Sequence, residues 1–128
     1  MKKTIALLFV AVFSIAAWSQ KWIRPSEAVK YQGNEVSFIG LVSSVYHADG
    51  IKGDRTVMNI AGNNSLNVLQ LVVYNSDRSN FSTTPETAWL DQYVQVKGTI
   101  EMVKGQPQIT LHSARQISIV RDGSPEQE

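Results

Sequence analysis

Residues 36–42 read VSFIGLV, and residues 94–100 return to the same pattern as VQVKGTI. Both stretches have the period-two alternation of a strand with one buried face. In each, a glycine, Gly40 or Gly98, interrupts an otherwise good strand pattern. Glycine weakens a strand interior and marks a bend, a bulge or a close approach of the backbone. The two stretches therefore predict two strands of one closing sheet, each bent sharply at its glycine.

Three more strand patterns lie around these two, and the expected strands cover residues 35–47, 56–62, 66–75, 93–103 and 108–120. A short helix is expected from Pro25 and is ended by Gly33, and a second runs from Pro85 to about Leu90. A β-sandwich usually needs about seven strands. Five short strands with minor helix instead predict an all-β fold, a small closed five-stranded Greek-key barrel with one helix between its third and fourth strands.

The first 19 residues, MKKTIALLFVAVFSIAAWS, combine a basic start, a short apolar run and small residues, as secretory signal peptides do. Ala17 and Ser19 stand at the −3 and −1 positions of a cleavage site, which places cleavage before Gln20. The alternative is a transmembrane anchor, although the apolar run is short for a bilayer about 30 Å thick. The pattern predicts a periplasmic or secreted protein.

Without Lys2 and Lys3, the twelve lysines and arginines fall to ten, against eleven aspartates and glutamates, a formal net charge of −1. A polyanion site on such a chain must be a local patch. The chain has no cysteine, which excludes disulfides, thiolate metal sites and a cysteine nucleophile. We expect one domain over residues 20–121 and a disordered tail over residues 122–128, which lack apolar residues.

Three runs carry a resemblance to a known family: IRPSEAVKYQGNEVSFIGLV (23–42), TVMNIAG (56–62) and YVQVKGTIEMVKGQPQITLHSARQISIV (93–120). Together they resemble the oligonucleotide/oligosaccharide-binding (OB) fold of exported bacterial proteins of the nucleic-acid-binding superfamily type. The resemblance covers nearly the whole chain after the signal peptide. It implies the five-stranded barrel, and it leaves the ligand open because this fold hosts nucleic-acid, sugar, peptide and protein binders.

No residue set predicts catalysis, a cofactor or a metal site. His47 and His112 are the only histidines and lie 65 residues apart, without the close spacing of zinc motifs. Asp49 and Asp54 flank a glycine-rich segment that lacks the ligand series of an EF-hand, so a solvated turn is favoured over a calcium site. We expect a binding protein and not an enzyme.

In the OB-fold family the ligand lies across strands two and three, between the loop joining strands one and two and the loop joining strands four and five. Carried over to this chain, the resemblance implies Tyr46, His47, Lys52 and Arg55 on one side, Asn59, Gln70 and Tyr74 on the floor, and Lys104 and Gln106 on the other side. Cations for phosphates and tyrosine rings for bases suit single-stranded nucleic acid. Alternatively, the tyrosines cap the barrel and the cations are solvated turn residues.

A second partner class remains open at the sequence level. Val57, Val68 and Val72 alternate with inward positions and, if exposed, suit a protein of the cell envelope, a peptide or a hydrophobic ligand, with a glycan also open. Trp22 and Trp89 each flank a helix, and we expect them to plug the barrel ends in preference to forming a ligand platform.

Overall fold

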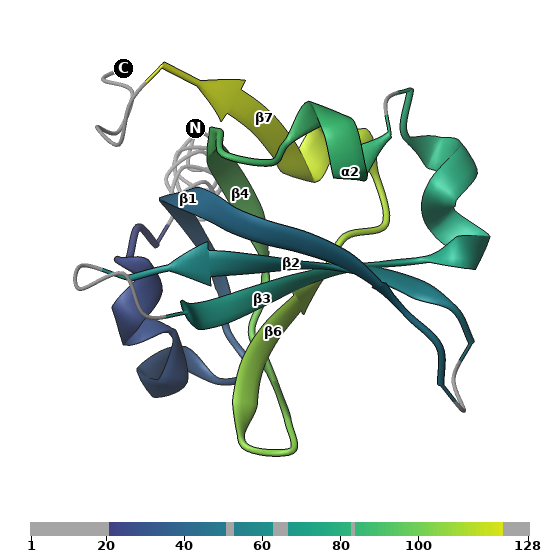
Figure 1. Ribbon diagram of the computed structural model, residues 1–128. Helices are drawn as coiled ribbons and strands as arrows, with labels where there is room; N and C mark the ends of the chain where they lie inside the picture. Colours follow the sequence, from purple (N-terminus) through teal and green to yellow (C-terminus); the bar gives the residue numbers. More distant parts are fainter. Residues whose placement is uncertain (1–20, 51–52, 63–66, 83, 122–128) are drawn as a thin grey trace, which may run out of the picture.

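The computed structural model describes residues 21–50, 53–62, 67–82 and 84–121, and one sheet of seven strands dominates them (Figure 1). The strands are β1 (Glu35–Ala48), β2 (Arg55–Ala61), β3 (Asn67–Tyr74), β4 (Tyr93–Thr99), β5 (Glu101–Val103), β6 (Gln106–Thr110) and β7 (Ile117–Val120). The helical segments are the 3₁₀ turns η2 (Pro25–Tyr31), η3 (Asn75–Asn80) and η4 (Ala114–Gln116) and the single α-helical turn α2 (Pro85–Ala88). The protein is thus mostly β with few helices, in an OB-like fold.

The two glycine-containing stretches pair with each other. In the antiparallel β1–β4 ladder Phe38 lies opposite Val96, and each glycine lies opposite the first valine of the other stretch, Val36 with Gly98 and Gly40 with Val94. Strand β1 then changes partner at Leu41, since residues 41–48 pair with β2. Gly40 therefore lies directly before the point where the strand leaves one neighbour for another, as the sequence predicts.

The expected count of five strands is wrong, because the last two expected strands are each divided. Ile100 separates β4 from β5. Its N–H donates to the carbonyl of Asn34 at 3.1 Å, and its carbonyl accepts the N–H of Gly33 at 2.8 Å. Its backbone therefore bonds the loop after η2 and leaves the sheet for one residue. Between β6 and β7, Ser113 caps the short turn η4 by accepting the N–H of Arg115 at 3.2 Å.

The sheet closes on itself. Its order is β5-β6-β3-β2-β1-β4-β7, and β5 follows β4 after a single residue although the two stand near opposite ends of that order. Closure depends on the parallel pairing of β6 with β3, in which Gln70, Leu71 and Val72 lie beside Gln108, Ile109 and Thr110. The result is a barrel-like sheet with one interior and one outer surface (Figure 1).

The alternation within the strands predicts an interior of ten apolar residues, and each of them is no more than 1% exposed: Phe38, Val42, Met58, Ile60, Leu69, Leu71, Val73, Val94, Val96 and Ile100. Ala28 of η2 joins this core from one side. Trp89, directly after α2, is 6% exposed and packs edge-on against Phe81 with ring centroids 5.7 Å apart, which confirms its expected burial.

The same expectation is wrong for Trp22, which is 41% exposed. Its segment forms a parallel bridge to Ser37, with backbone bonds from Ser37 to Lys21 and from Ile23 to Ser37. Successive residues of an extended segment point to opposite sides. Ile23 takes the buried side, at 8% exposure, and Trp22 therefore faces solvent.

The predicted signal peptide and tail, residues 1–19 and 122–128, lie outside the described residues. Among the helices of the described ranges, none has the length and apolar character needed to cross a bilayer.

Candidate ligand-binding face

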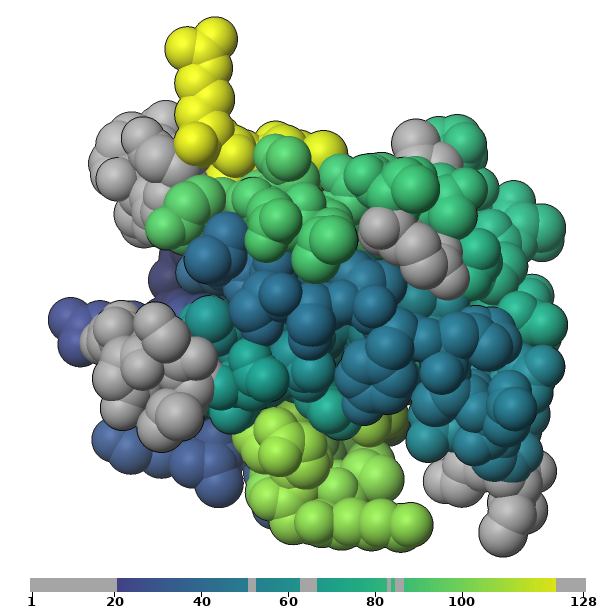
Figure 2. Space-filling model, in the orientation of Figure 1, coloured from purple at the N-terminus to yellow at the C-terminus, as the bar shows by residue number. Residues whose placement is uncertain are grey.

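One face of the barrel, formed by alternate residues of β1, β2, β3 and β6, brings most of the predicted site residues together (Figure 2). We call it the outer face, and it consists of Ser44, Tyr46, Arg55, Val57, Asn59, Gln70, Val72, Tyr74, Gln108 and Thr110. Figure 2 shows β1 in blue, β3 in teal and, below them, β6 in yellow-green meeting at one surface.

A row of polar side chains crosses the outer face. The strand registers place Ser44 beside Asn59, Asn59 beside Gln70, and Gln70 beside Gln108. The Asn59 amide donates to Ser44 Oγ at 2.9 Å and accepts from Gln70 Nε2 at 3.1 Å. These bonds fix the Asn59 side chain, and within the described residues the Gln70 carbonyl oxygen and its second N–H have no hydrogen-bond partner.

Aromatic and cationic groups lie in the neighbouring rows. Tyr46 is 44% exposed and lies opposite Val57, while Arg55 lies opposite Tyr74. The Arg55 guanidinium folds onto the β1–β2 loop, where its Nη1 stands 2.6 Å from the position that a Cβ on Gly50 would take. The face therefore combines two rings, one cation and a row of amides.

The outer valines do not meet the condition of exposure that a partner binding to them would need. Val57 and Val72 are only 3% and 1% exposed, and Val68 is partly buried against the core. Val57 and Val72 lie opposite each other in the middle of the sheet, where longer side chains such as Tyr46 and Tyr74 stand in the adjacent positions. These valines form the floor of the face and offer no exposed apolar patch to a protein partner.

A hollow of about 340 Å³ lies at the β6 end of the face and is lined by Tyr74, Glu101, Thr110 and His112. Thr110 Oγ1 donates to Glu101 Oε1 at 3.4 Å, and His112 Nδ1 lies 2.8 Å from a carboxylate oxygen of Asp77. The carboxylates of Glu101 and Asp77 thus lie at this end of the outer face, whereas the cation Arg55 lies toward the β1–β2 loop.

The remaining predicted residues are dispersed. Lys104 lies in the turn between β5 and β6 with φ of 52° and is exposed, and Gln106 begins β6 two residues before Gln108. These two residues border the outer face at the β6 edge, across the face from Tyr46, which is the side expected for them. Lys52 lies outside the described residues.

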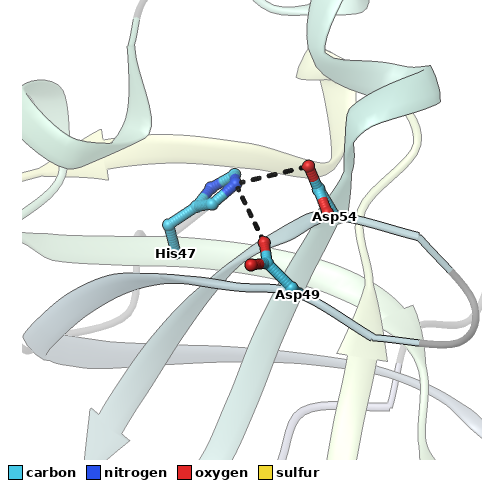
Figure 3. Close-up of side chains that lie close together, drawn as sticks. All are labelled: His47, Asp49 and Asp54. Carbon is cyan, nitrogen blue, oxygen red and sulfur yellow. Dashed lines mark ion pairs between the residues drawn. The ribbon is translucent and has the colours of Figure 1, made fainter.

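His47 does not join Tyr46 on the outer face, because neighbouring residues of a strand point to opposite sides. Its imidazole instead points between two carboxylates of the β1–β2 turn (Figure 3). His47 Nε2 lies 4.0 Å from both Asp49 Oδ1 and Asp54 Oδ2. No sequence motif links the histidine with the two aspartates, whereas the structure brings the three together.

Ser44, Gln108 and Thr110 belong to the face but were missed. The signal for them was present, because Gln106, Gln108 and Thr110 alternate with period two, as Ser44 and Tyr46 do. What the sequence could not supply was the parallel pairing that carries β6 alongside β3.

The sequence matches no protein-family model, and no curated protein is significantly similar to it. Solved structures do share its fold. OBody AM1L10 bound to hen egg-white lysozyme superposes with a TM-score of 0.53 at 18% identity, covering 82% of this chain and 98% of that one. A lipoprotein from Klebsiella pneumoniae, provisionally described as nucleic-acid-binding, superposes with a TM-score of 0.50 at 13% identity. The match covers 84% of this chain and 97% of that one.

The N-terminal domain of PriB from Thermoanaerobacter tencongensis gives a TM-score of 0.41 at 14% identity, covering 70% of this chain and 98% of that domain. At identities this low, the OBody and lipoprotein structures show a shared fold and nothing about a shared ligand.

Proposed function

We propose that this protein is a non-catalytic, exported binding module that holds single-stranded nucleic acid on its outer face. The observation that carries the proposal is the register of three strands, which sets Tyr46, Tyr74 and Arg55 around the amide row centred on Asn59 and Gln70. The description of the Klebsiella pneumoniae lipoprotein of similar fold as nucleic-acid-binding agrees with this choice.

Each part of the face suits one part of a single strand. Exposed tyrosine rings stack on bases of any sequence, contributing about 1–3 kcal/mol per base. Side-chain amides such as that of Gln70 can both donate to and accept from base edges. Arg55 and the bordering Lys104 would supply the positive charges for phosphates. With few cations, the affinity should come mainly from stacking.

Binding of a labelled single-stranded oligonucleotide, followed by fluorescence anisotropy, is the direct test. We expect the logarithm of the association constant to fall with the logarithm of salt concentration with a slope of about −2, if Lys52, Arg55 and Lys104 each release counterions. Arg55→Ala should lower the affinity and reduce the slope by about 0.7, the share of one phosphate contact on a single strand.

Arg115→Ala is the matched control, because Arg115 is an exposed arginine of η4 that lies away from the outer face. It should leave both affinity and slope unchanged. No affinity for any oligonucleotide at low salt would overturn the proposal, as would equal losses in the two arginine variants.

A glycan is the second candidate, and Glu101 favours it. Its carboxylate at the edge of the hollow repels phosphates but accepts hydrogen bonds from sugar hydroxyls, and Tyr74 and Thr110 line the same hollow. Binding of neutral oligosaccharides that does not respond to salt, with no binding of oligonucleotides, would select the glycan.

Export is the other part of the proposal, and residues 1–19 support it. Produced in a bacterium with an intact export pathway, the protein should be recovered from the periplasm or the medium, starting at Gln20. Intact-mass measurement of the recovered protein checks this. Recovery only at full length would contradict cleavage, and Ala17→Arg should block it because a large charged residue does not fit a small-residue cleavage site.

A further inference from the structure

The side-chain cluster of His47, Asp49 and Asp54 has no part in the proposed ligand face. One nitrogen and two carboxylate oxygens, one from each residue, all lie within 4.8 Å of one another (Figure 3). Nitrogen and carboxylate oxygen together are the donors that zinc-type ions accept in proteins. We infer that these three side chains form a binding site for one divalent transition-metal ion of the zinc type.

The hairpin ends hold the three residues in fixed positions. His47 is the penultimate residue of β1, and Asp49 and Asp54 flank the last cross-strand pair, Ala48 with Arg55. The carbonyl of Asp54 accepts the N–H of Asn75 at 2.9 Å. The donors therefore come from both arms of a paired hairpin, whose ladder sets their spacing.

The distances fit an ion better than they fit direct contacts. At 4.0 Å, His47 Nε2 is beyond hydrogen-bond reach of both carboxylates. Donor atoms that share a tetrahedral ion at bonds of 2.0–2.2 Å stand ~3.4 Å apart. To reach that spacing, each His47 distance of 4.0 Å must shorten by about 0.6 Å, and the two carboxylates, which lie within 4.8 Å of each other, must approach by up to about 1.4 Å, movements that exposed side chains can make.

The other histidine of the chain shows the contrast. His112 lies 2.8 Å from Asp77, a direct contact with a single carboxylate. The His47 imidazole makes no hydrogen bond within the described ranges and faces two carboxylates. Two like charges held this close repel each other, and a divalent cation between them offsets both. His112 therefore has a direct carboxylate partner, whereas the His47 imidazole faces two carboxylates at 4.0 Å without touching either.

The donor set also indicates which ions bind. Imidazole is a good ligand for zinc and a poor one for Mg²⁺, which prefers six oxygens and retains its water. Three protein donors leave at least one coordination position open, and all three side chains are exposed. An ion held here would present that open position to solvent at the tip of the β1–β2 turn.

Isothermal titration of the untagged full-length protein with ZnCl₂ tests the site. We expect saturable binding of one ion, and at least tenfold weaker binding in His47→Gln and in Asp54→Asn, since each removes one of three ligands. MgCl₂ should bind at least tenfold more weakly than ZnCl₂. Thermal melts should be unchanged in both variants because the side chains are exposed.

His112→Gln is the matched control, since it removes the only other histidine, which also has a carboxylate beside it. It should leave the zinc affinity within about twofold of the wild-type value. Absence of saturable zinc binding would overturn the inference. So would a loss in His112→Gln as large as that in His47→Gln, because the ion would then be held elsewhere.

Discussion

Gly98→Ala is expected to lower the free energy of unfolding by about 3 kcal/mol, the upper part of the range for overpacking a core. A Cβ at this position would lie 2.4 Å from Cγ2 of Ile109, a distance that real Cβ contacts do not show. Ile109 is fully buried on β6 and branches at Cβ, so its methyl group cannot rotate aside without leaving a preferred rotamer in a packed interior. Urea unfolding followed by tryptophan fluorescence would measure the loss, because Trp89 is buried.

A second variant isolates the cause. Ile109→Leu removes the branching methyl and should cost less than about 1.5 kcal/mol alone. The double variant Gly98→Ala with Ile109→Leu should lose clearly less free energy of unfolding than the sum of the two single variants, since the clash is gone. Gly50→Ala is the matched control: its Cβ would lie equally close to another atom, 2.6 Å from Arg55 Nη1, but that is the end of a flexible side chain. This account of Gly98 would be ruled out if Gly50→Ala and Gly98→Ala lowered the free energy of unfolding equally. It would also be ruled out if the losses of the two single variants added up strictly in the double variant.

Removing both rings of the outer face, with Tyr46→Ala and Tyr74→Ala together, is expected to weaken oligonucleotide binding about 100- to 1,000-fold. The reason is the loss of two stacking contacts, each contributing about 1–3 kcal/mol. Anisotropy at low salt measures the change. The corresponding double phenylalanine variant keeps both rings and should bind within about threefold of the wild type, because stacking uses the ring face and not the hydroxyl group.

Tyr93→Ala is the control for this experiment. Tyr93 is similarly exposed, at 37% against 44% for Tyr46, but it begins β4 and lies outside the outer face. It should bind like the wild type. If it loses as much affinity as the double alanine variant, or if that variant keeps its affinity, stacking on the outer face does not hold the ligand.

The sequence was informative about the barrel interior because a single rule governs it. Alternation within each strand decides which side chain is buried, and the glycines of VSFIGLV and VQVKGTI mark the strands that change partners. The same rule was misleading between β6 and β7. There QITLHSARQISIV reads as one strand, yet Ser113 and Gln116 have the spacing of a capping box, which ends the strand in a turn.

The outer face was predicted only in part, because it depends on which strands become neighbours. Asn59 and Gln70 belong to consecutive strands of a hairpin, so their proximity follows from the order of the chain. Gln108 reaches Gln70 through a parallel pairing across 38 residues, which no local pattern encodes. Similarly, His47 and Asp54 meet because a hairpin returns on itself, and spacing rules for linear metal motifs do not detect such a meeting.

The pairing of β6 with β3 also sets the order in which the protein can fold. Strands β1, β2 and β3 can pair as soon as residue 74 has been synthesised, but β3 keeps one open edge until residues 106–110 follow, and β1 waits for residues 93–99. Contacts so distant in sequence make folding slow relative to that of helical proteins of this size. Until those contacts form, the apolar faces of the first three strands are uncovered, and exposed apolar surface with an unpaired strand edge favours aggregation, so the last quarter of the chain protects the rest.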